Sequence, residues 1–184
     1  FFKNTTLWPI HSFQLNDRTR GPQQLLPTTV PTADGSDYLS ALYSLRAGHR
    51  KRYLELVDAL NSAIPELEEI EFPLAGAGHV SLAWRQSNLP RELYPNQLSD
   101  GTLRFLWLMT ILHTVPDDGL VLLDEPEISL HPQWLMLLVS ILRKVSARTN
   151  IIVATQSAEF LRWIDQSELL IADSSESGTT FKWA

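Results

Sequence analysis

The chain has 184 residues, the length of one domain. Hydrophobic residues make up 44% and charged residues 20%, a globular composition that argues against a disordered chain. The net charge of −6 argues against a surface that is basic all over, although a local patch for nucleic acid stays open. The absence of Cys excludes disulfide scaffolds, thiolate zinc sites and Cys nucleophiles. It also fits the reducing cytoplasm, where we expect the protein.

We expect neither a membrane span nor a signal peptide. The richest apolar runs, at residues 103–112 and 135–142, are shorter than the roughly 20 residues that a bilayer requires. The first residues, from Phe1 to Asn4, have neither a basic start nor a long apolar segment. Because the chain also begins without Met, we interpret it as part of a longer protein.

The first part of the chain is predicted to hold an irregular lead-in and two helices. Residues 14–37 are rich in turn-forming Gly, Pro, Asn and Asp, which indicates a long connection. Ser36 can cap a first helix whose apolar residues keep helical spacing from Tyr38 to Leu45. The same spacing predicts a second helix over residues 53–64.

A period of two then predicts an antiparallel hairpin. Its strands cover residues 70–74 and 80–84, on either side of Gly76-Ala77-Gly78. Pro73 has no backbone N–H to donate, so its strand is expected at an edge.

From residue 99 onward, helices and strands alternate. Helices are predicted at 99–113, at 132–146 and after Ser157, and strands at 120–124, 151–154, 169–172 and 180–183, the last two joined by a turn at Ser177-Gly178. This alternation predicts a largely parallel, covered sheet. The apolar strands 120–124 and 151–154 fit its centre.

The strongest chemical signal is a pair of acids at the end of an apolar strand. Asp124 and Glu125 follow Leu120-Val121-Leu122-Leu123, at the sheet edge where α/β proteins bind ligands. Adjacent carboxylates beside an apolar strand favour a cation, and Mg²⁺ bound to a nucleotide is the natural occupant. Asp124 would then hold the metal, and Glu125 would orient or deprotonate a water. A strand that runs out into an acidic turn is the alternative.

A second signal is a helix start, Ser99-Asp100-Gly101. Ser99 is a plausible N-cap, and Gly101 lets a ligand approach the backbone. The free N–H groups and the positive end of the helix dipole make such a start an anion site. Taken alone, the motif favours a simple capped helix.

A third signal is Thr155-Gln156-Ser157, which ends the second apolar strand at the same sheet edge. Gln156 could contact a γ-phosphate or the attacking water, and Ser157 could cap the next helix. A capped turn from strand to helix is again the simpler interpretation of the motif alone.

The order and spacing of these motifs resemble the C-terminal half of an ABC-type ATPase head, of the RecF-like and SMC-like branch of AAA-type ATPases. Residues 98–104 resemble the signature motif, 120–125 the Walker B strand, 127–132 the D-loop region and 155–157 the switch segment. The resemblance covers roughly residues 98–160. It implies a P-loop NTPase-like α/β fold with a helical insertion, here a partial domain of three segments, 1–37, 38–97 and 98–184.

The resemblance also implies ATP and Mg²⁺ as cofactors and a second head as partner. Asp124, as metal ligand, and the catalytic residues Glu125 and Gln156 would act on ATP held by their own subunit. Ser99 and Gly101 would contact the γ-phosphate of ATP held by the other head, so that ATP joins two heads and hydrolysis separates them. DNA or a protein effector is the further partner that such heads serve, in DNA maintenance or defence.

Two departures from the family pattern stand out. The usual switch His is Gln156, which cannot take a proton at neutral pH. No G-x-x-x-x-G-K-[ST] phosphate loop is present, and family order places that loop before Phe1, so the chain alone is expected to be inactive. Two alternatives stay open: a non-enzymatic dimerisation or regulatory module, and an unrelated Mg²⁺-dependent hydrolase that uses Asp124, Glu125 and Asp117.

Several other residues carry weaker signals. Arg104 is expected in an ion pair or at the site of the second head, and His131 as a capping or D-loop residue. The basic cluster at residues 48–52 favours a solvated surface over a DNA contact. Trp107 and Trp134 are expected in the core.

Overall fold

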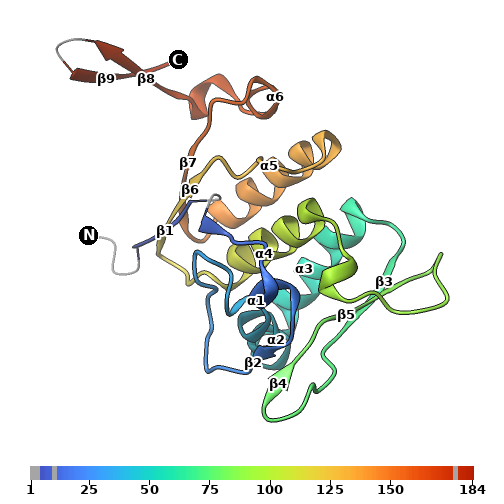
Figure 1. The fold of residues 1–184 in the computed structure, drawn as a ribbon. Helices are drawn as coiled ribbons and strands as arrows, with labels where there is room; N and C mark the ends of the chain where they lie inside the picture. The colour runs from blue at the N-terminus through green and yellow to red at the C-terminus, as the bar shows by residue number, and fades with distance from the viewer. Residues whose placement is uncertain (1–4, 10–11, 176–177) are drawn as a thin grey trace.

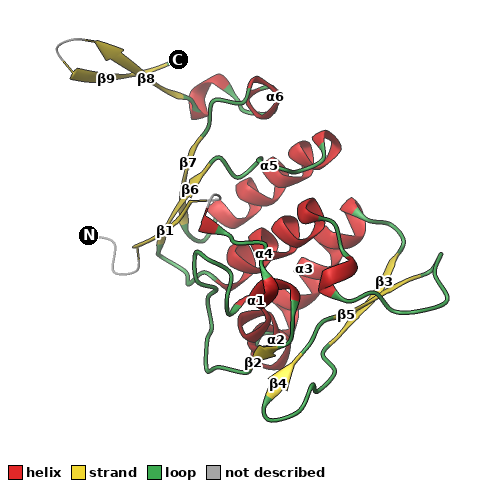
Figure 2. Cartoon of the chain, viewed as in Figure 1, coloured by secondary structure: helices red, strands yellow, loops and turns green. Residues whose placement is uncertain are grey.

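The computed structural model describes residues 5–9, 12–175 and 178–184. Figures 1 and 2 show an α/β chain with a helical body, a parallel sheet and small antiparallel pairs. The helices are α1 (Asp17–Arg20), α2 (Tyr38–Gly48), α3 (Arg50–Ala63), α4 (Asp100–Thr114), α5 (Pro132–Ser146) and α6 (Ala158–Leu161), with 3-10 turns η2 (Pro95–Gln97) and η3 (Gln166–Glu168). The strands are β1 (Thr5–Pro9), β2 (Gln23–Gln24), β3 (Leu67–Glu71), β4 (His79–Val80), β5 (Ala83–Gln86), β6 (Leu120–Asp124), β7 (Asn150–Ala154), β8 (Leu170–Ser175) and β9 (Gly178–Trp183).

The parallel sheet has the order β1-β6-β7. β6 is central, as predicted, and pairs with β1 on one side and β7 on the other. β7, also predicted at the centre, lies at an edge among the described residues. β1 lies in the lead-in, residues 1–37, which was expected to hold strand and loop, and it occupies the other side of β6.

Helices cover one face of this sheet. The register places Trp8, Leu123 and Val153 on the same face, where Trp8 and Leu123 join the hydrophobic core. The opposite face carries Leu7 and Ile152, which are 53% and 58% exposed. The α/β class with a parallel sheet is confirmed, and in the described chain its cover is one-sided.

α4 is the central helix of the body and packs against α2, α3 and α5 (Figure 1). Its residues from Phe105 to His113 are all buried, which explains why its sequence is apolar all round rather than amphipathic. Trp107 is buried and stacks on Phe13 with ring centroids 4.8 Å apart. Trp134, in α5, packs at the border of the core. No helix in the described ranges is long and apolar enough to cross a bilayer.

The predicted first helix is confirmed, but its N-cap is Asp37 rather than Ser36. The Asp37 carboxylate accepts hydrogen bonds from the N–H and the hydroxyl of Thr32, at 2.8 Å each. It therefore holds the preceding loop instead of capping the helix with its side chain.

The predicted hairpin has the expected antiparallel pairing with different strand limits. Ile70 pairs with Trp84, within β3 and β5. The predicted second strand is interrupted, because Val80 lies in the separate strand β4 and pairs with Gln23 of β2. The two final strands are confirmed as the β8–β9 hairpin, which projects from the body in Figure 1. Ser177 of the predicted turn lies outside the described residues.

Candidate functional site

The ends of β6 and β7 bring two of the three predicted motifs together. Asp124 and Ala154 are register partners at the last positions of these parallel strands. The Glu125 N–H donates to the Ala154 carbonyl at 2.8 Å and extends the pairing by one step. Glu125 and Gln156 therefore leave the sheet at the same edge, as predicted from the sequence.

Glu125 and Gln156 contact each other directly. The Gln156 side-chain amide donates from Nε2 to Glu125 Oε1 at 2.7 Å. The Glu125 backbone has a φ of +48°, in the left-handed region that non-glycine residues rarely adopt. Such conformations are most common at functional sites, where the surrounding structure imposes them. Here it turns the chain sharply out of the strand beside Gln156.

Asp124 is the last residue of β6 and is half-buried. By the alternation of side chains along a strand it shares the open face of the sheet with Leu122. The described residues contain no group of three or more His, Asp and Glu side chains that could hold a metal ion. The role of Asp124 as a ligand of Mg²⁺ stays a prediction.

Glu127 begins the segment that resembles the D-loop region, and the structure gives it a contact that the sequence did not predict. The Thr155 hydroxyl donates a short hydrogen bond to Glu127 Oε1, next to the Gln156–Glu125 pair. The sequence offered two signals, the resemblance of residues 127–132 to the D-loop region and a third acid soon after the Asp124-Glu125 pair. A spacing of two residues in a loop does not predict which side chains meet.

Ser99 and Gly101 lie at the start of α4, which packs against the loop that follows β6. Ser99 caps the helix, since its Oγ accepts from the Thr102 N–H at 3.1 Å, and it is exposed. A Cβ atom on Gly101 would lie 2.6 Å from the Ser129 carbonyl oxygen. The glycine is thus required by the chain's own backbone, and its contact with a ligand stays a prediction.

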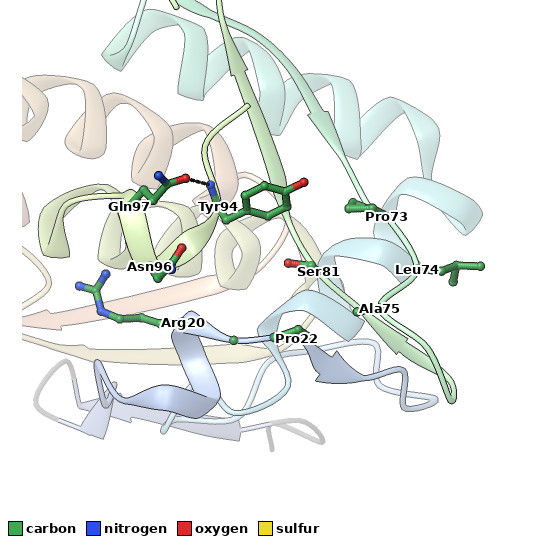
Figure 3. A pocket seen from close by; sticks show the side chains of 10 residues that line it. Arg20, Pro22, Pro73, Leu74, Ala75, Ser81, Tyr94, Asn96 and Gln97 are labelled. Atoms are coloured by element: carbon green, nitrogen blue, oxygen red, sulfur yellow. Dashed lines mark hydrogen bonds between the residues drawn. The ribbon is translucent and has the colours of Figure 1, made fainter. Parts of the chain in front are cut away.

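Arg20 holds the segment that precedes Ser99. Its guanidinium donates to the carbonyls of Pro95 and Leu98, both at 3.0 Å, and pairs with the Asp100 carboxylate. Arg20 also lies at the border of an open hollow of about 590 Å³. Figure 3 shows the side chains that line it, among them Arg20, Asn96 and Tyr94. No lining residue comes from the ends of β6 or β7 and none is acidic, so the hollow is separate from the carboxylates.

Asp117 lies at the opposite end of the sheet from Asp124. It precedes β6, whose length separates the two by roughly 15 Å at about 3.3 Å per residue. Arg52 donates to both Asp117 oxygens, at 2.8 and 2.9 Å, and Arg148 to one, at 3.1 Å. The hydrogen bond from Arg148 and the nearby Arg52 hold the pKa of Asp117 below its usual value. The alternative of an unrelated hydrolase whose site is built from Asp124, Glu125 and Asp117 is therefore wrong.

The other singled-out residues have structural contacts. His131 caps α5, with its ring Nδ1 accepting from the Gln133 N–H at 3.3 Å. The Arg104 guanidinium lies over the Phe13 ring, 5.7 Å from its centroid. Ser157 caps α6, as predicted.

A family model described as "AAA domain, putative AbiEii toxin, Type IV TA system" matches residues 19–162. This match, together with the α/β fold and its parallel sheet, defines the class of AAA-type ATPase domains. The match covers well over half of the chain, and the chain therefore belongs to that AAA-domain family. ATPases of this kind bind ATP, typically with Mg²⁺. No curated protein sequence matches the chain.

Solved SMC heads share the fold. A structure titled "Structural biochemistry of ATP-driven dimerization and DNA stimulated activation of SMC ATPases" matches with a TM-score of 0.58 and 11% identity, over 76% of this chain and 86% of that one. A second match is the Smc head from Pyrococcus furiosus with an extended coiled coil, bound to the C-terminal domain of ScpA. Its TM-score is 0.57 and its identity 10%, over 81% of this chain and 38% of that one. The SMC head domain from Thermotoga maritima matches with a TM-score of 0.53 and 14% identity, over 78% of this chain and 51% of that one. This chain thus spans about half or less of the length of the Pyrococcus and Thermotoga chains.

Proposed function

We propose that this chain is the C-terminal part of an ATPase head that binds ATP with Mg²⁺ and hydrolyses it. The observation that carries the proposal is the 2.7 Å hydrogen bond between Gln156 and Glu125 at the ends of adjacent parallel strands. It joins a carboxylate, which can accept a proton, to an amide that fixes its orientation. We assign residues 98–184 to the signature, Walker B and switch core, 38–97 to a helical and hairpin insertion, and 1–37 to the lead-in.

In this proposal Glu125 is the general base for the attacking water. A base needs an oriented acceptor oxygen within reach of the proton that it takes. Gln156 binds Oε1 of Glu125 and so fixes the orientation of the carboxylate. Because an amide does not titrate near neutral pH, Gln156 acts as an orienting group rather than as a second base. Asp124 would hold Mg²⁺, which neutralises charge on the phosphates when it is bound.

The start of α4 is proposed to serve a second head. Ser99 is exposed at the N-terminus of a 15-residue helix, where free N–H groups and the helix dipole favour an anion. The nucleotide of a partner head would supply that anion as its γ-phosphate. ATP-driven dimerisation, described for the matched SMC ATPase, supports the same arrangement here.

The test of the base assignment is Glu125→Gln in the full-length protein. We expect ATP binding to be retained and phosphate release to fall by about a hundredfold or more, since removing a catalytic base costs two to four orders of magnitude. The control is Glu68→Gln, which changes an exposed carboxylate in β3 to the same amide. Unchanged turnover in the Glu125 variant would remove Glu125 from the base role.

The phosphate loop is proposed to come from sequence outside these 184 residues. None of the eight glycines of the chain opens a G-x-x-x-x-G-K-[ST] motif. Sequencing the coding region before Phe1 tests this directly. A phosphate loop after a predicted strand supports a working ATPase, whereas a start codon just before Phe1 favours the non-enzymatic dimerisation or regulatory module.

A role in DNA maintenance or defence is part of the proposal, as is a cytoplasmic location. The family includes a toxin of a toxin–antitoxin system in its description, and the matched SMC ATPase is one whose activation is stimulated by DNA. We therefore expect double-stranded DNA to raise the ATPase rate of the full-length protein at low salt. A rate that DNA leaves unchanged at all salt concentrations would direct the search to a protein effector.

A further inference from the structure

Two hydrogen bonds join the end of β7 to the loop that follows β6. Gln156 donates to Glu125, and its neighbour Thr155 donates to Glu127. Both members of the second bond are half-buried, whereas Gln156 is exposed. The protected bond therefore lies directly beside the exposed one that the chemistry uses.

Backbone hydrogen bonds fix the conformation of the loop that carries Glu125 and Glu127. It turns at Glu125, with its positive φ, and the Ile128 N–H closes the turn on the Glu125 carbonyl at 3.2 Å. The Leu130 N–H then donates to the Glu127 carbonyl at 3.0 Å. This hydrogen-bonded backbone keeps the Glu127 side chain at a set position relative to Glu125.

The Thr155 hydroxyl uses both of its hydrogen-bonding functions. It donates to Glu127 and accepts from the Ser157 N–H at 3.0 Å. Ser157 in turn caps α6, with its Oγ accepting from the Phe160 N–H at 3.2 Å. The backbone on both sides of Gln156 is thereby tied to the loop and to the start of α6.

Glu127 is a poor residue for stability alone. Its second oxygen, Oε2, is shielded from solvent and has no hydrogen-bond partner among the described residues. A buried polar atom without a partner destabilises the folded state, so it calls for another reason for the residue. Holding Thr155 is that reason.

We propose that Glu127 and Thr155 are positioning residues, which hold Gln156 in the orientation that binds Glu125. We call this pair the Glu127–Thr155 latch. The inference rests on the proposed function, in which Glu125 is the base. A long amide side chain has many rotamers in solvent, and the latch removes the freedom of the backbone that carries it.

The test compares Thr155→Val with Thr155→Ser in the full-length protein. Valine keeps the shape and removes the hydroxyl, and we expect its kcat to fall by about tenfold or more, since small misplacements in a site cost up to a hundredfold. The KM for ATP should stay near wild type, whereas the melting temperature should fall, because valine leaves Glu127 Oε1 and the Ser157 N–H without their partner. Serine keeps the hydroxyl and should restore kcat. Thr29→Val, at an exposed position, is the control for the loss of a threonine hydroxyl.

A double mutant distinguishes positioning from a general structural role. If Thr155 acts through Gln156, Thr155→Val combined with Gln156→Ala should be no slower than Gln156→Ala alone. Rate losses that multiply would overturn the latch, as would a Thr155→Ser variant that is as slow as Thr155→Val. If the valine variant does not fold, Glu127→Gln, which keeps an acceptor for Thr155, should be fast, and Glu127→Ala slow; equal rates for these two would also overturn the latch.

Glu125→Gln, measured beside these variants, separates the two ideas. A dead Glu125 variant with a fully active Thr155→Val would overturn the latch and leave the proposed function standing. A Glu125 variant at the wild-type rate, or a wild type without turnover, would overturn the proposed function and the latch that rests on it.

Discussion

Gly101 meets the loop after β6 at the closest backbone approach of the site. A Cβ atom there would lie 2.6 Å from the Ser129 carbonyl oxygen, closer than real Cβ atoms approach backbone. We therefore expect Gly101→Ala to force the loop or the helix start to shift. The substitution should destabilise the protein by about 1–3 kcal/mol, as overpacked substitutions do. Thermal unfolding measures this, and ATP turnover should fall with it, because the same loop carries Glu125.

Gly48 provides the matched control for this substitution. It ends α2, and a Cβ atom there would meet nothing within 4 Å. Gly48→Ala should leave the free energy of unfolding unchanged or raise it slightly, since alanine restricts the unfolded chain. Equal losses in the two variants would show that the contact with Ser129 is not what Gly101 is needed for.

At the level of single residues, the sequence predicted the ends of the strands but not their side-chain partners. Asp124, Glu125 and Gln156 follow apolar strands, and strand ends gather at one sheet edge by geometry alone. The partner of Thr155 depends on how the loop turns at Glu125. A positive φ at a non-glycine residue has no signature in the sequence, so the contact between Glu127 and Thr155 was not predicted.

The N-terminus of α4 is the element on which the dimer proposal depends. Ser99→Arg places a long cation where a partner's nucleotide would approach, and we expect it to abolish the ATP-driven dimer. ATP binding by the single head should persist, because the binding groups assigned to its own subunit lie at the ends of β6 and β7. Size-exclusion chromatography with light scattering, in the hydrolysis-deficient Glu125→Gln background, measures the dimer.

Ser99→Ala separates the loss of the cap from the block of the interface. It removes the bond from Ser99 Oγ to the Thr102 N–H and should cost about 1 kcal/mol of stability. A dimer that forms with alanine and not with arginine supports contact across the interface. A dimer that survives arginine would show that the assignment of Ser99 to the second head is wrong.

Elements with strong local signals were predicted well. α5 was placed from Pro132 to Ser146 and β6 from Leu120 to Asp124, with the limits that the structure gives. These limits could be predicted because a proline at a helix start and a continuous apolar run determine the local structure from only a few neighbouring residues. β4 was merged into a longer strand, because its partner Gln23 lies far away in the sequence. Whether such a short stretch forms a strand depends on pairing with a distant segment, and a single sequence does not reveal that pairing.

At the scale of the whole molecule, the helical core buries a titratable group. His113, in α4, is 4% exposed, and its ring Nδ1 hydrogen-bonds the Met109 carbonyl at 2.7 Å. Burial lowers the pKa of His113 to about 4, against the raising effects of that hydrogen bond and of Glu55. Arg148 and Lys144, near the end of α5, lower it further. The folded core therefore holds a neutral imidazole at neutral pH.

This burial makes the stability of the fold depend on pH. The unfolded chain binds a proton at His113 near pH 6.5, while the folded chain does not until about pH 4, so acidification favours the unfolded state across that window. The free energy of unfolding should fall by ~3 kcal/mol between pH 7 and pH 4 from this group, at 1.36 kcal/mol per pKa unit. Urea unfolding at intervals of half a pH unit measures the slope. His113→Gln should flatten it, whereas His49→Gln, at an exposed position, should leave it unchanged. An equally steep slope in the His113 variant would show that His113 is not its source. Asp117, whose pKa is lowered by its arginine partners, loses its stabilising contribution only below about pH 4 and so does not act in this window.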